Sequence, residues 1–204
     1  MDRWATFDCY GTLVDWNAGI RAVLGDDLLA RYHELEPQIQ AEQPSLSYRE
    51  VMTEASRRLG VENVHALAES LPRWPVFAEV PSALADARTR GWRLAILSNT
   101  DRDYVDASIA AIGVAFDLAV VASEIGSYKP ALGHWRAFQD RVGRLPDVHV
   151  GASHFHDVVP ATLLGIPTVW INRERESGGT APTREQPDLG GLADTLDGLV
   201  PASL

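Results

Sequence analysis

The residues best suited to chemistry in this sequence are polar side chains that follow short apolar runs. Asp8 ends the apolar run at residues 4–7, and the pair Ser98-Asn99 ends the run WRLAIL at 92–97. Lys129 stands in the polar stretch SYKP, and Asp157 closes the stretch GASHFHD. An ionised aspartate at the end of a buried strand is placed to act as a nucleophile. The other side chains would assist it if the fold brings all of them to one crevice.

The elements that would position these residues are short strands separated by helices. We expect strands at residues 4–7, 92–97, 118–121, 148–150 and 168–171, because each run is short and rich in β-branched or aromatic residues. Helical patterns such as PSALADARTRG, with its glycine stop, lie between them. This alternation predicts an α/β fold with a parallel sheet covered on both faces. Ligands bind beyond the carboxyl ends of such strands, where the polar residues stand.

One segment interrupts the alternation. Between about residues 16 and 78 there is no strand pattern, only helical stretches around 18–43 and 47–70. Three prolines between residues 71 and 81 would then lead the chain back to the sheet. We therefore predict an α/β core made of residues 1–14 and 79–204, with a helical cap at 15–78. The polar stretch GGTAPTREQPDLGG is expected to be a loop, and the last helix to cover the sheet edge.

Composition narrows the classes of function. The 204 residues carry a net charge of −10, which disfavours nucleic acid as a partner, although a small anionic substrate could be held by local cations. No stretch approaches a membrane span, and no export signal is recognised at the N-terminus. The single cysteine, Cys9, cannot form an internal disulfide and is expected in the core. We therefore expect a cytoplasmic protein without membrane or nucleic-acid partners.

The order of the four polar segments resembles a known superfamily. FDCYGT, LSNTD, SYKP and the final HD resemble the motifs of the haloacid dehalogenase-like hydrolases, across nearly the whole chain. The resemblance implies a Rossmann-like core with a helical cap, Asp8 as nucleophile, and Ser98, Lys129 and Asp157 as its partners. Each residue alone has a structural explanation, such as a helix cap or a solvated loop lysine. Four coincidences in this order are a weaker explanation than a catalytic set.

Tyr10 distinguishes between two branches of that superfamily. The phosphatases carry a second aspartate two residues after the nucleophile, which protonates the departing alcohol. A tyrosine, with an ordinary pKa of about 10, is poorly suited to that task, whereas a halide leaves without a proton. The form DCYGT resembles the type II 2-haloacid dehalogenases, which implies hydrolysis of the carbon–halogen bond of short 2-haloacids through an aspartyl ester. No cofactor is needed for that reaction.

Two alternatives remain open at this stage. In the first, Tyr10 packs under the cap of a Mg²⁺-dependent phosphatase, with Asp8, the Tyr10 carbonyl and Asp157 around the metal. The usual second acid beside the last aspartate is His156 here, which weakens such a site. In the second, the protein kept the fold as a binding or regulatory protein and lost the chemistry. The intact set of Asp8, Ser98 and Lys129 argues against this last alternative.

The resemblance also implies roles around the nucleophile. Lys129 would keep Asp8 ionised, and Asp157 would position that lysine or the hydrolytic water. Thr12, Ser98 and Asn99 would hydrogen-bond the nucleophile or the substrate carboxylate, although the Thr12 hydroxyl also suits a turn. Homodimers are frequent among such dehalogenases, so a homodimer is an open expectation.

Further residues are expected to contact the substrate. ARYHELEP places Arg31 where the dehalogenases carry a substrate-binding arginine, although a surface helix arginine is an equal explanation. Trp16 and Asn17 would line the passage between cap and core, unless Trp16 is hinge packing, and Tyr10 would contact the substrate. Trp135 and His154 depart from the tyrosine and asparagine of those enzymes. Their ring N–H groups, with Arg31, are predicted to receive the departing halide.

Overall fold

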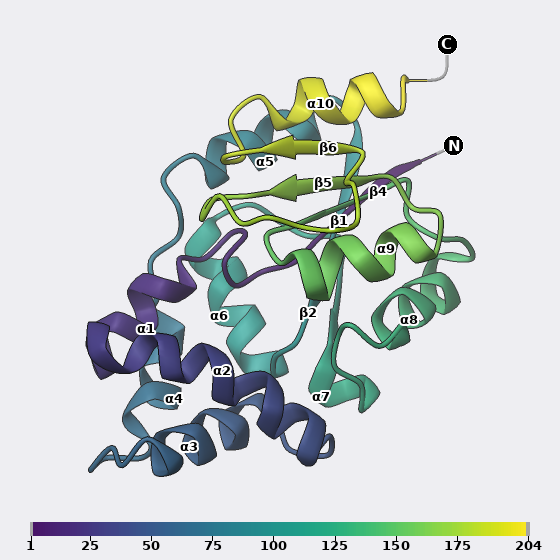
Figure 1. Cartoon of the computed structure of the whole chain (residues 1–204). Coiled ribbons are helices and arrows are strands. Elements are labelled where there is room, and N and C mark those ends of the chain that lie inside the picture. The colour runs from purple at the N-terminus through teal and green to yellow at the C-terminus, as the bar shows by residue number, and fades with distance from the viewer. Residues whose placement is uncertain (1, 203–204) are drawn as a thin grey trace.

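The computed structural model describes residues 2–202, and its core is a parallel six-stranded sheet. The strand order is β3-β2-β1-β4-β5-β6, and each neighbouring pair is parallel. Helices lie on both sides of this sheet (Figure 1), so the α/β fold predicted from the sequence is confirmed. The strands are β1 (Arg3–Phe7), β2 (Trp92–Ser98), β3 (Leu118–Val121), β4 (Val148–Gly151), β5 (Thr168–Ile171) and β6 (Arg184–Gln186).

Side chains of the central strands alternate between two apolar layers. In β2, Leu94 and Ile96 belong to the larger hydrophobic cluster, whereas Ala95 and Leu97 belong to a second cluster on the other face. The larger cluster includes side chains of α5 (Val80–Thr89), α6 (Arg102–Ile112) and α10 (Leu192–Leu199). The second includes side chains of α8 (Gly133–Val142) and α9 (Val159–Leu163). Burial on both faces explains why these strands appear as continuous apolar runs.

The strand order determines which chain segments meet. β1 lies between β2 and β4, and the backbone N–H of Asp8 donates to the Val150 carbonyl at 2.9 Å, which extends the pairing by one residue. Because the strands are parallel, their carboxyl ends lie at one edge of the sheet. The short helices α7 (Ala122–Ile125) and η2 (His154–Val158) follow two of these ends directly.

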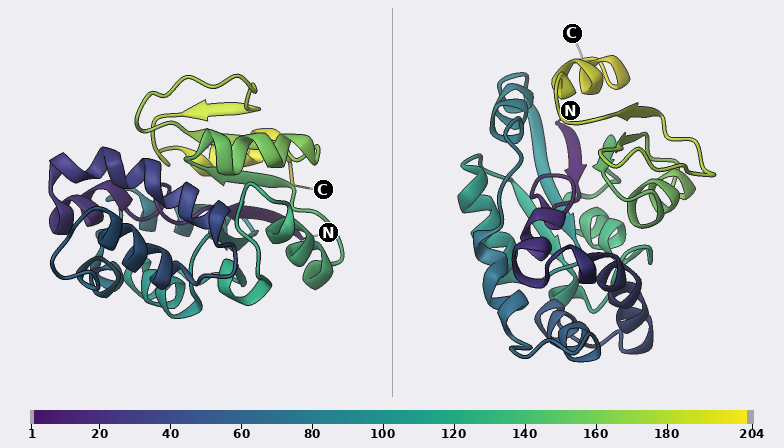
Figure 2. Two further views of the ribbon diagram at one scale, coloured as in Figure 1. Left: turned by 60° about the horizontal axis from the view of Figure 1, so that its bottom comes forward. Right: turned by 60° about the vertical axis from the view of Figure 1, so that its left-hand side comes forward.

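All the helices between β1 and α5 form the insertion expected from the sequence (Figure 2). The expected stretches 18–43 and 47–70 are each divided in two, the first at Gly25, whose φ of 75° suits glycine. The cap boundaries at residues 15 and 78 stay a prediction, and residues 1 and 203–204 of the predicted core lie outside the described residues. The helices of the insertion are α1 (Trp16–Leu24), α2 (Asp26–Glu42), α3 (Tyr48–Arg58), α4 (Ala66–Ser70) and η1 (Leu71–Arg73).

Two connecting segments join the insertion to the sheet and run side by side. Asp15 N–H donates to the Pro75 carbonyl at 2.7 Å, and Phe77 N–H donates to the Leu13 carbonyl at 3.1 Å. Arg173 crosses both segments, because its guanidinium donates to the Thr12 carbonyl at 2.9 Å and to Glu79 at 2.6 Å. The insertion is therefore tied to the core at its base.

The polar stretch near the C-terminus contains a strand that the sequence did not indicate. The expected loop includes β6, which pairs with β5 in the register Val169↔Arg184. β6 is a short edge strand with exposed residues, so backbone hydrogen bonds hold it and no apolar alternation marks it. Across residues 2–202, none of the helices combines the length and apolar character that crossing a membrane would require.

Candidate active site

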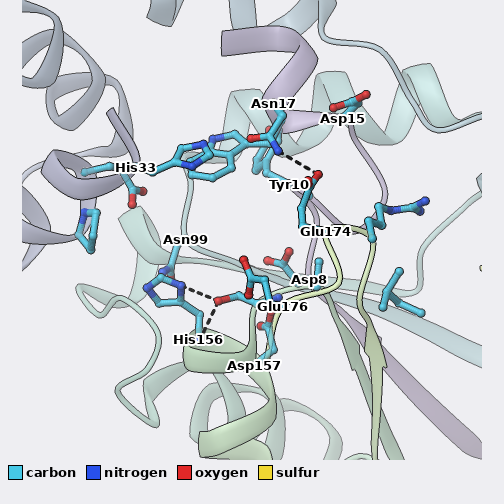
Figure 3. Close-up of a pocket in the computed structure, with 18 of the residues that line it drawn as sticks. Asp8, Tyr10, Asp15, Asn17, His33, Asn99, His156, Asp157, Glu174 and Glu176 are labelled. Atoms are coloured by element: carbon cyan, nitrogen blue, oxygen red, sulfur yellow. Dashed lines mark hydrogen bonds between the residues drawn. The ribbon is translucent and has the colours of Figure 1, made fainter. Parts of the chain in front are cut away.

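A pocket of about 620 Å³ lies between the inserted helices and the carboxyl ends of the strands. Helices α1 and α2 line one side, and residues following β1, β2, β4 and β5 line the other (Figure 3). Residues with an expected role at the site line this pocket. They are Asp8, Tyr10, Trp16, Asn17, Ser98, Asn99, Lys129 and Asp157.

The Asp8 carboxylate is held by one partner on each oxygen. Lys129 Nζ donates to Asp8 Oδ1 at 2.8 Å, and Thr12 Oγ1 donates to Asp8 Oδ2 at 2.9 Å. Thr12 Oγ1 in turn accepts from the backbone N–H of Ala152 at 2.9 Å. Thr12 itself is fully buried and does not line the pocket. It therefore acts through Asp8, whose carboxylate it orients.

Lys129 is shared between two carboxylates. Its Nζ also donates to Asp157 Oδ1 at 2.6 Å, and Asp157 accepts a further bond from the Ser153 N–H at 3.1 Å. His149 Nε2 lies 3.2 Å from the same Asp157 oxygen. Lys129 and Asp157 are buried, which removes competing water from these bonds. One ammonium thus joins Asp8 and Asp157 in a cluster that carries one net negative charge.

Burial and this shared ammonium set the protonation of the cluster. Burial raises the pKa of Asp8, and Lys129 opposes that rise. Burial also disfavours the ionised form of Asp157, but Lys129 and His149 outweigh it and hold the Asp157 pKa below its ordinary value. Burial would lower the pKa of Lys129, but the two carboxylates keep it raised, so the lysine stays charged. An ionised Asp8 facing the pocket is a nucleophile without a competing proton.

Ser98 and Asn99 have different positions beside this cluster. The Asn99 amide donates to the Lys129 carbonyl at 3.0 Å, and the Lys129 N–H donates to Asn99 Oδ1 at 2.6 Å, so this side chain holds the lysine backbone. Ser98 lines the pocket, and its Oγ is buried and makes no hydrogen bond within residues 2–202. The Ser98 hydroxyl is therefore a buried polar group without a partner among these residues.

The Tyr10 phenol is held by contacts with neighbouring side chains and is poorly suited to donate a proton in the pocket. Its hydroxyl is hydrogen-bonded to Ser108 Oγ at 3.1 Å, and its ring packs against Tyr48 and Trp74. Burial raises the Tyr10 pKa well above its ordinary value of 10.0. Tyr10 thus packs under the inserted helices, as one of the alternatives for this residue expected. The same position carries no acidic group.

The structure corrects three predicted substrate contacts. Arg31 lies exposed on α2 and does not line the pocket. Trp135 is fully buried in the second hydrophobic cluster, with its ring 5.2 Å from that of His149. His154 lies outside the pocket lining, 2.9 Å from the Thr180 carbonyl. These side chains are not assembled into a halide site, because α2, α8 and η2 each direct them elsewhere.

Several lining residues were not identified from the sequence. His33 and Glu174 lie around the upper part of the pocket in Figure 3, and Glu174 accepts at 3.2 Å from Asn17, which was expected to line the passage between cap and core. Burial lowers the pKa of His156, which also lines the pocket, to about 4, so its imidazole is neutral near pH 7. Residues 172–176 directly follow β5, so the strand-end rule applied to the other strands would have found Glu174 and Glu176. Nothing in the sequence pattern distinguishes His33 or Glu36, which come from α2.

The residues present fit a divalent metal poorly. Asp8 and Asp157 would be the protein ligands, but both already accept from the Lys129 ammonium. No cluster of three or more histidine, cysteine, aspartate or glutamate side chains suited to a metal occurs within residues 2–202. A Mg²⁺ ion prefers an octahedral set of oxygens, of which these two carboxylates would supply only a part.

Comparison with known proteins gives a family and curated relatives. The family model described as haloacid dehalogenase-like hydrolase matches residues 3–151. A phosphoserine phosphatase of Thermus thermophilus is 32% identical over 134 residues, which cover 62% of this chain and 53% of the relative. An (S)-2-haloacid dehalogenase of a Pseudomonas species is 29% identical over 145 residues, which cover 64% of this chain and 59% of the relative. The matched segments thus span little more than half the length of these relatives.

A solved structure agrees over almost the whole chain. An L-2-haloacid dehalogenase superposes with a TM-score of 0.82 at 22% identity, covering 96% of this chain and 99% of the other. At that identity the agreement concerns the fold: the sheet and the inserted helices are shared. The curated relatives include both a phosphatase and a dehalogenase.

Proposed function

Because the chain belongs to the haloacid dehalogenase-like hydrolases, we propose that it hydrolyses the carbon–halogen bond of short 2-haloacids through an ester on Asp8. The observation that carries the proposal is the surroundings of Tyr10. Its phenol is bonded to Ser108 and keeps its proton, so the position two residues after the nucleophile supplies no acid. A halide is a leaving group that needs none.

The first step forms the covalent intermediate. An Asp8 carboxylate oxygen attacks the carbon that bears the halogen, and the halide leaves with the bonding electron pair. Lys129 and Thr12 hold the carboxylate in place, which lowers the entropic cost of reaching the attack geometry. Ser98 Oγ, free of other hydrogen bonds within the described residues, is placed to hydrogen-bond the substrate.

The second step regenerates the enzyme. Water adds to the carbonyl carbon of the Asp8 ester, the ester bond breaks, and the 2-hydroxy acid leaves with one proton of that water. The second proton is released to solvent, and Asp8 returns as a carboxylate. Asp157 keeps Lys129 oriented toward Asp8 throughout, so the ammonium can stabilise the developing negative charge. The reaction proceeds without a metal.

A second candidate is a Mg²⁺-dependent phosphatase. It is supported by the 32% identity to phosphoserine phosphatase, which exceeds the identity to the dehalogenase. In such an enzyme, Asp8 and Asp157 would hold the metal beside Lys129. It would also need a proton donor other than Tyr10.

One screen separates the two functions. Halide release from chloroacetate and 2-chloropropionate, and phosphate release from phosphoserine, are measured with EDTA and with added Mg²⁺. We expect halide release that EDTA does not change and that the Asp8→Asn variant loses. Phosphate release that requires Mg²⁺, without halide release, supports the second candidate and refutes the first.

The ester intermediate has its own test. In a single turnover with excess enzyme in heavy-oxygen water, we expect the label to appear in the Asp8 carboxylate, detected by peptide mass spectrometry. Label found directly in the 2-hydroxy acid and never in Asp8 would refute the covalent route.

Location and assembly complete the proposal. We propose a cytoplasmic location, supported by Cys9, a buried cysteine that forms no disulfide. A homodimer stays a prediction, and light scattering of the purified protein would test it.

A further inference from the structure

Glu36 places a carboxyl group of the inserted helices in the wall of the pocket that holds Asp8. It lies on α2, lines the pocket, and is only 8% exposed. The Gln40 side-chain amide donates to Glu36 Oε1. The second oxygen, Oε2, makes no hydrogen bond within residues 2–202. A carboxyl group that is buried to this extent favours its protonated form unless a cation or a ligand compensates its charge.

The cations of the pocket do not compensate Glu36. Arg21 is bonded to Asp26 at 2.5 Å, Arg173 to Glu79 at 2.6 Å, and Lys129 to the two carboxylates described above. Every lysine and arginine in the pocket lining thus already has an acidic partner. Seven acidic residues line the same pocket, namely Asp8, Asp15, Asp26, Glu36, Asp157, Glu174 and Glu176.

The surroundings of Glu36 favour its protonated form. Tyr32 on the same helix, Tyr48 on α3 and Tyr128 before α8 are close enough to interact with its charge, and burial keeps these phenols protonated. Asp8 faces it across the pocket as an anion. Burial first, and then this anion, raise the pKa of Glu36 to about 7. His33, beside it on α2, is neutral because burial lowers its pKa.

We propose that Glu36 determines substrate specificity, and that the pocket accepts an anionic substrate only while Glu36 holds its proton. This proposal rests on the proposed function and names the residue that receives the non-reacting end of the substrate. The protonated carboxyl can donate a hydrogen bond to a substrate carboxylate, whereas the ionised form repels it. Glu36 thus takes the place that Arg31 was expected to fill on the same helix.

The test compares an anionic substrate with a neutral one of the same shape. We measure kcat/KM for chloroacetate and for 2-chloroacetamide between pH 6 and pH 8, in the wild type, Glu36→Gln and Glu34→Gln. The ratio of the two values cancels the titration of Asp8, Lys129 and the water that both substrates share. For a group with a pKa of about 7, we expect the wild-type ratio to fall about tenfold over this range.

The variants assign that fall to a residue. In Glu36→Gln the ratio of the two kcat/KM values should stay constant with pH. In the wild type, the fall of this ratio should appear in the KM for chloroacetate rather than in kcat. Glu34 is an exposed acid on the same helix, so Glu34→Gln should behave as the wild type. Equal pH dependence in the wild type and Glu36→Gln would overturn the proposal.

Binding of glycolate, an unreactive anion of the product type, separates this proposal from the proposed function. If the wild type releases no halide but binds glycolate more weakly as pH rises, and Glu36→Gln does not, the proposed function falls and the role of Glu36 stands. If halide is released and the ratio of kcat/KM for chloroacetate to that for 2-chloroacetamide does not depend on Glu36, the proposed function stands and the role of Glu36 falls. Failure of both halide release and glycolate binding would overturn both.

Discussion

Replacing Lys129 by methionine tests the central electrostatic feature of the site. The Lys129 ammonium lies 2.8 Å from Asp8 and 2.6 Å from Asp157, and both aspartates are buried residues. Methionine has a similar length and no charge, so it removes the shared cation without leaving a large cavity. Two buried carboxylates then remain without the ammonium that they share. Breaking a buried ion pair in this way costs roughly 3 to 5 kcal/mol in the free energy of unfolding.

The loss should depend on pH with a definite sign. In the wild type the Asp157 pKa is held low, so its stabilising contribution is present above its ordinary pKa of 3.8 and is lost as pH falls. In Lys129→Met the carboxyl pKa values are raised instead, so the variant becomes less stable as pH rises. The difference between the two proteins should therefore be small near pH 4 and reach its full size near pH 7.

Urea unfolding of both proteins at several pH values between 4 and 8, followed by circular dichroism, measures this difference. Arg58→Met is the matched control, because Arg58 is an exposed cation that also bonds two carboxylates, at 2.8 and 2.9 Å. Surface pairs of that kind contribute less than about 1 kcal/mol. A Lys129→Met protein as stable as the wild type at pH 7, or a deficit that does not change with pH, would refute the reasoning.

Four further outcomes are expected. Tyr10→Phe should release halide within about twofold of the wild-type rate, because the phenol is no proton donor; a hundredfold loss would contradict this. Thr12→Val should lower kcat about 10- to 100-fold, the value of one hydrogen bond to a charged group, with KM little changed. On acidification, kcat/KM for a neutral haloamide should halve at a pH above 3.8, because burial raises the Asp8 pKa; a midpoint at or below 3.8 would contradict this. Arg31→Ala should leave kcat/KM for chloroacetate unchanged in a steady-state assay, because this side chain is outside the pocket.

The sequence was sufficient for most of the sheet. Five expected strands match β1 to β5 to within one residue at each end. Most of their residues are buried, so each appears as a mainly apolar run. β6 was missed because an exposed edge strand of three residues is held by its backbone and shows no pattern in its side chains. The helix breaks at Gly25 and after Arg58 were missed for a related reason, since the helical pattern continues on both sides.

The pocket residues on the strands were also predictable. Asp8, Ser98, Lys129 and Asp157 all lie on or after the carboxyl ends of neighbouring strands. In a parallel sheet those ends share one edge whatever the details of packing. That Tyr10 supplies no acid at its position stays a prediction, which rests on the high ordinary pKa of a phenol.

Only the tertiary structure decided what the inserted helices present to that edge. Arg31 and Glu36 are five residues apart on α2, which separates them by about 140° around the helix axis. Burial of Tyr32, Ile39 and Gln40 turns Glu36 toward the pocket and leaves Arg31 in solvent. The sequence of α2 contains polar residues on every side, so it did not indicate its inner face. The rotation of α2 about its own axis is set by packing against the other helices and the sheet, which are distant in sequence. Because of this packing, the buried acid Glu36 lines the pocket, where the cation Arg31 was expected.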